Sequence, residues 1–230
     1  MNKKIYPFLS FLIIFAFNNS YAQFSKNLSV GAGAGGTTLF GDLRYIPVGY
    51  AGHLDVDYLI SPFISVGVNA QSGKLSANDS YGRDSENKYK AVNGNIKVRA
   101  GQFFVKTENY SYYMLSNKGL SSYLANIYLG AGLGFLKNNV EAQWPDINGT
   151  SDNLTYENHS TELIVPLNVG IDIPFGSSLY GPTWAINLNY QHSFASSDNL
   201  DGFVSPYSSH NDQYSYWSLA VKVGLFNRKK

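Results

Sequence analysis

A set of charged residues in this sequence has the spacing needed to meet inside a folded chain. Each of these residues lies in a stretch where polar and apolar residues alternate, and successive side chains of a β-strand point to opposite faces. If the polar face is enclosed, these charges must pair, because an isolated buried charge costs several kcal/mol. We therefore expect a structural ion-pair network, with a charged constriction for small ions as the alternative. Its members are Asp55, Asp57, Lys97, Arg99, Glu162, Asp172 and Lys222.

Histidines are the next candidates for chemistry, and they are His53, His159, His192 and His210. The run Gln191-His192-Ser193 suggests a hydrolase, with His192 as base and a serine as nucleophile. Neighbours on a strand point to opposite faces, so His192 and Ser193 cannot form a dyad. We expect His192 to be an interface residue and predict no catalytic residue, so the chain is not expected to be an enzyme.

Metal and cofactor sites are also weakly indicated. Asp198-Asn-Leu-Asp201-Gly202 has oxygen ligands and a glycine like part of a calcium loop, but it lacks the downstream Glu at the required spacing. The glycine-rich residues 31–36 lie inside an expected strand and do not open a helix. With 0 cysteines, neither disulfides nor Cys-ligated zinc are possible. We expect no metal and no cofactor.

Composition narrows the class of protein. The 230 residues are 44% hydrophobic, too apolar for a disordered chain, and only 14% are charged. Lys and Arg exceed Asp and Glu by 17 − 16 = +1, so there is no basic field for nucleic acid.

The first residues have the features of a secretory signal peptide. Lys3 and Lys4 precede an apolar run over residues 5–17, and Ser20-Tyr21-Ala22 offers small residues before a cut. We predict a signal peptide over residues 1–22 and one β-barrel domain over residues 23–230.

Alternation with a period of two continues through the rest of the chain and predicts strands, not helices. An all-β, antiparallel up-and-down barrel of eight strands follows, and its apolar faces are pure over five or six positions. The expected strands are residues 28–40, 50–60, 64–71, 92–100, 123–135, 163–173, 184–191 and 217–225.

The opposite strand faces carry amides and glycines, where a solvated sheet would carry more Lys and Glu. Aromatic residues such as Tyr58, Phe63 and Trp184 lie near expected strand ends, as in a membrane-interface belt. These features favour a transmembrane barrel with its apolar face toward lipid over a soluble barrel. The residues expected to face lipid are Val66, Val98, Leu129, Val169, Leu188 and Val221.

Connections of unequal length fit this class. Residues 76–88, 143–160 and 195–213 should be long external loops, and Ser61-Pro62 a tight periplasmic turn. Residues 105–120 are the exception, because they are too many for a short turn. They could form helical turns, a loop, or a missed strand pair that would make the barrel ten-stranded.

Several short motifs resemble the small outer-membrane β-barrel proteins of Gram-negative bacteria, which are grouped with the OmpA-type transmembrane domain. They are Gly130-Ala-Gly-Leu-Gly-Phe135, Ile164-Val-Pro-Leu-Asn-Val-Gly170, Tyr190-Gln-His-Ser-Phe194, Ser197-Asp-Asn-Leu-Asp-Gly202 and Gly224-Leu-Phe226. The resemblance implies a place in the outer membrane, contact with its lipid, and assembly by the barrel-insertion machinery, with Phe226 as the assembly signal.

Three functions remain open at this point. An eight-strand barrel is just wide enough for side chains to fill, so a structural or interaction role in adhesion or envelope integrity comes first. A narrow porin-like channel for small solutes or ions is the alternative, and an outer-membrane lipid hydrolase is a distant third. Within the lumen, the small residues Ser65 and Gly67 should let Asp55 and Asp57 reach Lys97 and Arg99, with Asp57 and Arg99 as a pair. The external ligand cannot be named from the sequence.

Overall fold

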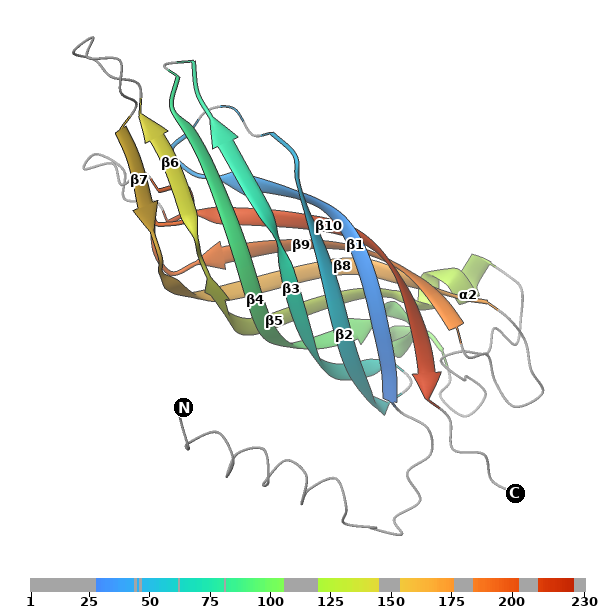
Figure 1. Ribbon diagram of the computed structural model, residues 1–230. Helices are drawn as coiled ribbons and strands as arrows, with labels where there is room; N and C mark the ends of the chain where they lie inside the picture. The colour runs from blue at the N-terminus through green and yellow to red at the C-terminus, as the bar shows by residue number, and fades with distance from the viewer. Residues whose placement is uncertain are drawn as a thin grey trace, which may run out of the picture.

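The computed structural model describes residues 28–43, 45, 47–61, 63–80, 82–105, 120–144, 154–175, 184–202 and 211–225. Nearly all of these residues form one antiparallel sheet (Figure 1). Its strands are β1 (Leu28–Phe40), β2 (Gly49–Ser61), β3 (Ile64–Asn78), β4 (Asp84–Arg99), β5 (Ile127–Lys137), β6 (Val140–Trp144), β7 (Leu154–Asn158), β8 (Thr161–Phe175), β9 (Trp184–Ala195) and β10 (Gln213–Leu225).

The sheet closes on itself into a barrel. Each of β1 to β4 pairs with the next strand, β4 pairs with β5, and β5 pairs with β8. The ring continues through β9 and β10, and β10 pairs with β1 over the full length of both strands, from Leu28 with Leu225 to Phe40 with Gln213. Closure leaves no unpaired sheet edge along the ring, which a membrane requires because lipid offers no hydrogen bonds.

The described part of the chain therefore forms a ring of eight strands, as predicted. β6 and β7 are not additional strands of this ring. Asn138 and Asn139 join β5 to β6, and His159 and Ser160 join β7 to β8. Backbone hydrogen bonds between Lys88 and Asn139 carry the pairing across the first join, so β6 and β7 are outward extensions of β5 and β8.

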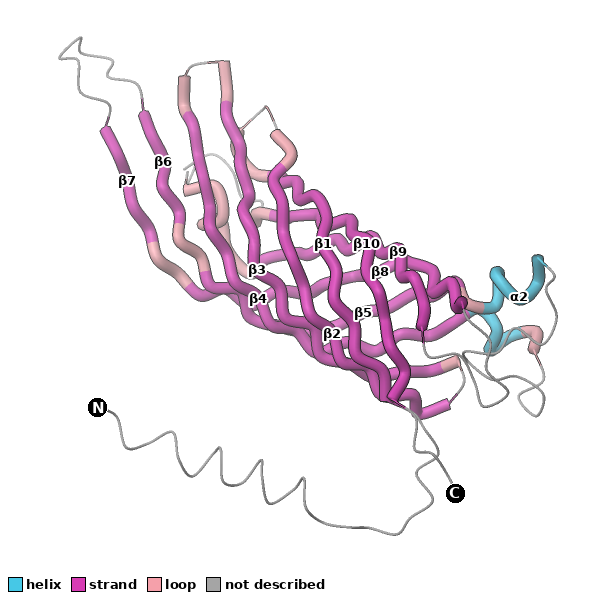
Figure 2. The backbone as a smooth tube through the Cα atoms, turned by 45° about the vertical axis from the view of Figure 1, so that its right-hand side comes forward, coloured by secondary structure: helices cyan, strands magenta, loops and turns pink. Residues whose placement is uncertain are grey.

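The two ends of the barrel differ. We call the end with the β3–β4 connection and the β6–β7 hairpin the loop end, and the opposite end, with the turn after Ser61, the turn end (Figure 2). At the turn end the Ser61 hydroxyl accepts hydrogen bonds from the backbone N–H groups of Phe63 and Ile64. At the loop end Gly82, with φ +81°, and the Asp79 carboxylate, which accepts from the Arg83 N–H, close the β3–β4 connection. Short turns at one end and longer loops at the other are typical of membrane barrels.

Alternation along each strand divides the residues into two chemically different faces, in the sense predicted. Apolar side chains point outward and are exposed, among them Leu54, Ile96, Leu129, Leu167 and Leu219. Polar side chains point inward and are buried, among them Asn93, Asn168 and Gln191. Apolar outside and polar inside is the arrangement of a transmembrane barrel and the reverse of a soluble one. No helix among the described residues is long and apolar enough to cross a membrane.

Some predicted boundaries are wrong. Residues 123–126 were expected to begin a strand, but Tyr123 belongs to α2 (Leu120–Ala125) and β5 begins only at Ile127. Ala100 was expected to end a strand and instead begins the 3-10 helix η1 (Ala100–Phe103). The expected loop at 76–88 is mostly strand, since β3 extends to Asn78 and β4 begins at Asp84. Similarly, β7 lies within the expected loop at 143–160. In the loop-end part of β4 the outward residues include Lys88 and Lys90, so the run of outward apolar residues that predicts a strand is absent there.

Phe63 is a further correction. It was expected in the interfacial belt but is only 1% exposed. Its ring lies against Gly101, where any Cβ would overlap it. This residue closes the turn end of the barrel. Of the segment 105–120, residues 106–119 lie outside the described residues.

Candidate functional site

The inward charges of the barrel gather in one layer, which we call the charged layer. Six of the charged residues singled out in the sequence belong to it, and each is at most 6% exposed. They come from strands β2, β4, β8 and β10, which lie on different sides of the ring. The members are Asp55, Asp57, Lys97, Arg99, Asp172 and Lys222.

Asp57 and Lys222 form the centre of the charged layer. The Lys97 ammonium donates to both Asp57 carboxylate oxygens, at 2.8 and 3.0 Å. The Lys222 ammonium donates to Asp57 Oδ2 at 2.8 Å. Lys222 Nζ also lies 3.5 Å from Asp55 Oδ2 and 3.7 Å from Asp172 Oδ1. One ammonium therefore faces three carboxylates.

Arg99 closes the layer against β8, where its Nη2 donates to Asp172 Oδ2 at 3.0 Å. The expected pair of Arg99 with Asp57 is wrong. Along β4, Lys97 precedes Arg99 and pairs with Ser65 in the ladder, so it is the nearer cation to Asp57 across β3. Lys97 occupies the Asp57 carboxylate, and Arg99 reaches across the lumen to Asp172.

Three carboxylates and three cations make the formal charge of the layer 3 − 3 = 0. This balance matters because the lumen holds little water to screen an excess charge. Breaking one buried pair by removing a single partner costs about 3–5 kcal/mol. The layer is thus arranged so that each of its charges has an opposite charge within 4 Å.

Glycines on neighbouring strands, which have no side chain, make room for the charged side chains. A Cβ at Gly31 would lie 2.6 Å from Asp55 Oδ1, and one at Gly67 would overlap the Asp57 carboxylate. Real Cβ atoms do not approach so closely, so both positions require glycine while the carboxylates stay in place. The inward glycines are therefore part of the charged layer's construction.

Glu162, also singled out in the sequence, lies elsewhere. It is buried near the start of β8 at the loop end, where it accepts long hydrogen bonds from Ser196 and Asn199 at 3.5 and 3.4 Å. Ten residues of the same strand separate it from Asp172, which is about 33 Å at the rise of a strand. Alternation identifies its inward direction but not its depth, and depth excludes it from the layer.

A layer of polar groups lies on the loop-end side of the charged layer, and His53 Nε2 lies 3.4 Å from Asp55 Oδ1 where the two layers meet. Gln71 donates to Gln191 Oε1 at 2.8 Å across the lumen, and the His53 ring meets the Tyr216 hydroxyl at 2.7 Å. Lower down, the Tyr128 hydroxyl accepts from Asn187 at 2.9 Å. A cavity of about 20 Å³ remains among these groups, enough for about one water molecule.

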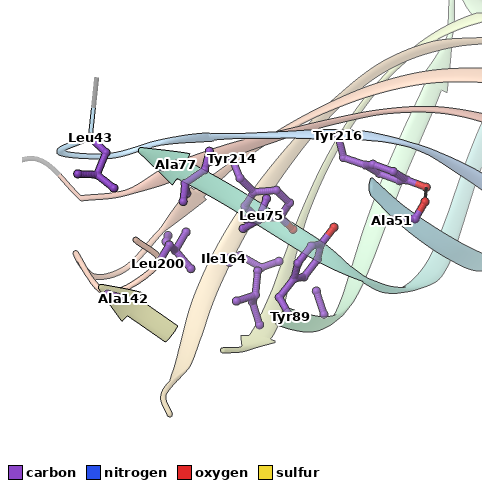
Figure 3. Close-up of a cluster of buried hydrophobic side chains, with 14 residues drawn as sticks. Leu43, Ala51, Leu75, Ala77, Tyr89, Ala142, Ile164, Leu200, Tyr214 and Tyr216 are labelled. Carbon is purple, nitrogen blue, oxygen red and sulfur yellow. Dashed lines mark hydrogen bonds between the residues drawn. The ribbon is translucent and has the colours of Figure 1, made fainter. Parts of the chain in front are cut away.

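Apolar side chains fill the lumen toward the loop end, and we call them the apolar plug (Figure 3). The Tyr89 and Tyr214 rings pack against each other with centroids 5.5 Å apart. The plug was not predicted, because Tyr214 and Tyr216 precede the strand start expected at Trp217; extending the alternation backward would have found them. Its larger members are Leu39, Leu43, Leu75, Tyr89, Leu136, Ile164, Leu200, Tyr214 and Tyr216.

His192 lies on the outer face and Ser193 on the inner face, so the two cannot form a dyad, as expected. His192 contacts Ser215 Oγ through Nδ1 at 2.8 Å and Gln213 Oε1 through Nε2 at 2.9 Å. A serine next to a histidine is a hydrolase-like contact. However, Ser215 is 1% exposed and its Oγ also meets the Tyr190 hydroxyl at 2.8 Å, so a substrate has no access to it. The group is a satisfied polar cluster in the aromatic exterior.

The segment that resembles part of a calcium loop, residues 198–202, contributes Asp201 to a pair of buried carboxyl groups, and Asp212 is the other member. Asp201 Oδ2 accepts from the Asp42 N–H at 2.8 Å, and Asp212 Oδ2 accepts from the Leu200 N–H at 2.7 Å. Burial and the charge of Asp201 raise the pKa of Asp212 to about 8. Within the described ranges, no group of three or more His, Cys, Asp or Glu side chains could hold a metal ion. The raised pKa of Asp212 favours the protonated form of its carboxyl group at neutral pH.

Three further predicted features fall outside the part of the chain that the structure describes. Phe226, His210 and the predicted signal peptide lie outside the described residues. Their roles stay predictions.

Comparison with known proteins gives a consistent but distant picture. No protein-family model and no curated protein matches the sequence. Among solved structures, the chain is similar to Neisserial surface protein A, with 12% identity, a TM-score of 0.49 and coverage of 86% of this chain and 97% of that one. It is also similar to Ail, the attachment invasion locus protein of Yersinia pestis, with 13% identity, a TM-score of 0.49 and coverage of 87% and 99%. A third similar structure is the N-terminal barrel of Pseudomonas aeruginosa OprF, with 7% identity, a TM-score of 0.39 and the same coverage.

The strand pairing itself shows a closed antiparallel barrel with an apolar exterior. At these identities and TM-scores the likenesses carry no argument, so any role must be argued from the side chains of this chain.

Proposed function

We propose that this protein is a non-conducting barrel of the outer membrane, which acts as a structural scaffold and presents its loop end for interaction. The observation that carries the proposal is the filled lumen. The charged layer, whose formal charge is zero, the polar layer and the apolar plug follow one another along the lumen. The cavity left among the polar groups is only about 20 Å³.

An open channel would need the opposite construction. Ion pathways require a continuous wet route, and a hydrophobic constriction excludes water and ions. Here the apolar plug spans the loop end from β1 to β10, with Leu39, Leu75 and Tyr214 all 0% exposed. A solute entering from the loop end would have to displace packed side chains, so a porin-like role is disfavoured.

The exterior supports placement in a membrane. The outward side chains of the ring are apolar on strand after strand, and the aromatic residues Trp184, Tyr190 and Trp217 are exposed among them. A soluble protein would not leave so continuous an apolar surface in water.

Conductance in planar bilayers tests the proposal. Refolded protein should first show a heat-dependent shift on a gel, which reports a folded barrel. The same material should then give no discrete conductance steps. Reproducible steps from heat-shifted protein would overturn the non-conducting role and favour the channel.

The presenting role needs a second experiment. Residues 145–153, which connect β6 to β7, can be replaced with Asn-Gly, a sequence suited to a two-residue hairpin. The trimmed barrel should keep the heat-dependent shift, because the change lies outside the ring. It should lose whatever attachment or envelope resistance the intact chain confers on cells. Full retention of both properties would contradict a role for this part of the loop end.

A further inference from the structure

The exposed apolar side chains of the ring form what we call the apolar band. A group of lysines lies on the outer face at the loop-end border of this band, where β4, β5 and β8 pass side by side. Val92, Phe135 and Leu163 form one cross-strand row of exposed apolar residues. The next row toward the loop end contains Lys90 and Lys137, which are directly opposite each other in the β4–β5 ladder. The outer face therefore changes from apolar to cationic within one row.

This arrangement is unfavourable for an empty protein surface. Like charges directly opposite each other on neighbouring strands repel. No carboxylate among the described residues lies within salt-bridge distance of Lys90 or Lys137. Lys88 in the following row differs, because Glu141 and Glu86 neutralise it at 3.3 and 3.8 Å. The uncompensated charge belongs to the row that adjoins the apolar band.

The backbone adds a hollow at the same place. The regular ladders of β5 and β8 are interrupted at residues 138–139 and 159–160, and the outer surface there has a half-open hollow of about 340 Å³. That volume falls in the range of small-molecule sites, about 300–1,000 Å³. The hollow is lined by Lys88, Lys90, Lys137, Asn138, Asn139 and His159.

We propose that this hollow, which we call the lysine hollow, binds the phosphate headgroup of an anionic lipid in the outer leaflet. The inference rests on the membrane placement proposed above. Its position decides between a lipid and a soluble anion: acyl chains attached to a phosphate held by Lys90 and Lys137 would lie along Val92, Phe135 and Leu163. Ammonium groups make strong charge-assisted hydrogen bonds to phosphate oxygens, and the anion would also remove the repulsion between the two lysines.

Native mass spectrometry of the full refolded chain in neutral detergent micelles can test the site. Phosphatidic acid is the anionic probe, and phosphatidylcholine with the same acyl chains is the zwitterionic comparison. The folded chain should retain phosphatidic acid in preference. Lys90→Gln and Lys137→Gln should each weaken that binding about five-fold, and the double variant should weaken it about 25-fold. These values follow from an electrostatic attraction of about 1 kcal/mol per lysine.

Lys74→Gln is the matched control. Lys74 is on the neighbouring β3, carries the same charge and already has a salt bridge with Glu86 at 2.5 Å. Its removal changes the net charge equally but leaves the lysine hollow intact, so phosphatidic acid binding should change less than two-fold. Equal losses from Lys74→Gln and Lys90→Gln would show a general charge effect and overturn the site.

Two other results would also overturn it. Unchanged binding in the heat-shifted double variant would show that the lipid binds elsewhere. Competition by inorganic phosphate at the same concentration as phosphatidic acid would assign the hollow to a soluble anion. If the wild-type chain shows no heat-dependent shift on a gel, the membrane barrel itself is rejected. Failure of the site and failure of the proposed function are therefore distinguishable.

Discussion

The Arg99–Asp172 pair offers the sharpest test of the charged layer. Arg99→Gln removes a cation whose Nη2 lies 3.0 Å from Asp172 Oδ2. At an effective dielectric constant of about 20, unit charges at that separation attract by about 5.5 kcal/mol before desolvation is counted. Lys222, 3.7 Å from the other Asp172 oxygen, retains part of the compensation. We therefore expect the single substitution to cost about 3 kcal/mol, the lower end of the range for a broken buried pair.

The double variant Arg99→Gln with Asp172→Asn restores the balance, at 2 − 2 = 0 formal charges in the layer. Its loss of unfolding free energy should be about 2–3 kcal/mol smaller than the sum of the losses in the two single variants. Urea unfolding in lipid vesicles, followed by tryptophan fluorescence, measures the four free energies, and the heat shift on a gel confirms folding beforehand.

A second double-mutant cycle tests whether the coupling comes from direct contact between two residues or only from the net charge of the layer. Arg99→Gln with Asp57→Asn also leaves the layer neutral, but these two residues do not form a salt bridge in the structure. Its coupling should stay below about 1 kcal/mol. Equal coupling in both cycles would refute the contact-based reasoning, and additivity in the Arg99–Asp172 cycle would refute the pair.

Three further predictions concern packing, depth and pH. Gly67→Ala should destabilise the barrel by about 1–3 kcal/mol because its Cβ overlaps a carboxylate, whereas Gly94→Ala, whose Cβ meets nothing closer than 4.0 Å, should be nearly neutral in the same urea assay. Leu129→Arg should cost about 2–4 kcal/mol in lipid vesicles, but Thr161→Arg, beyond the apolar band, about 0–1; similar costs would show that the band is misplaced. The raised pKa of Asp212, about 8 against an ordinary 3.8, means that the folded chain binds the extra proton, so stability at the loop end should fall as pH rises from about 4 through 8. Hydrogen exchange of residues 196–202 across this range should show the loss, and Asp212→Asn should abolish its pH dependence.

The inner face of the barrel has little room for a larger side chain, and Asn95→Arg illustrates this. Asn95 is 7% exposed and faces the polar layer, whose remaining cavity is only about 20 Å³. An arginine there would overpack the lumen and unbalance its charge, so it is not a mild control for a lipid-facing substitution.

Much of the architecture could be predicted because one physical constraint acts on every strand. A chain that crosses lipid as β-strands must close its sheet and turn apolar side chains outward. That requirement appears in the sequence as a period of two, and β1 has the bounds predicted for it, Leu28–Phe40. The inward direction of Asp57, Lys97 and Lys222 follows from the same alternation.

Partners inside the lumen could not be predicted in the same way. Which side chains meet depends on the stagger between strands and on the curvature of the closed ring, neither of which has a local signal. Thus Arg99 pairs with Asp172 from β8 in place of Asp57, and Glu162 lies too far along β8 to join the layer.

The sequence alone predicted a barrel with an apolar exterior and charges inside, since face and period are properties of single strands. Only the tertiary structure decided that the charges balance, that tyrosines and leucines seal the loop end, and that Lys90 and Lys137 face each other above the apolar band. These features join residues far apart in the chain, and their contacts exist only once the ring has closed in its particular register.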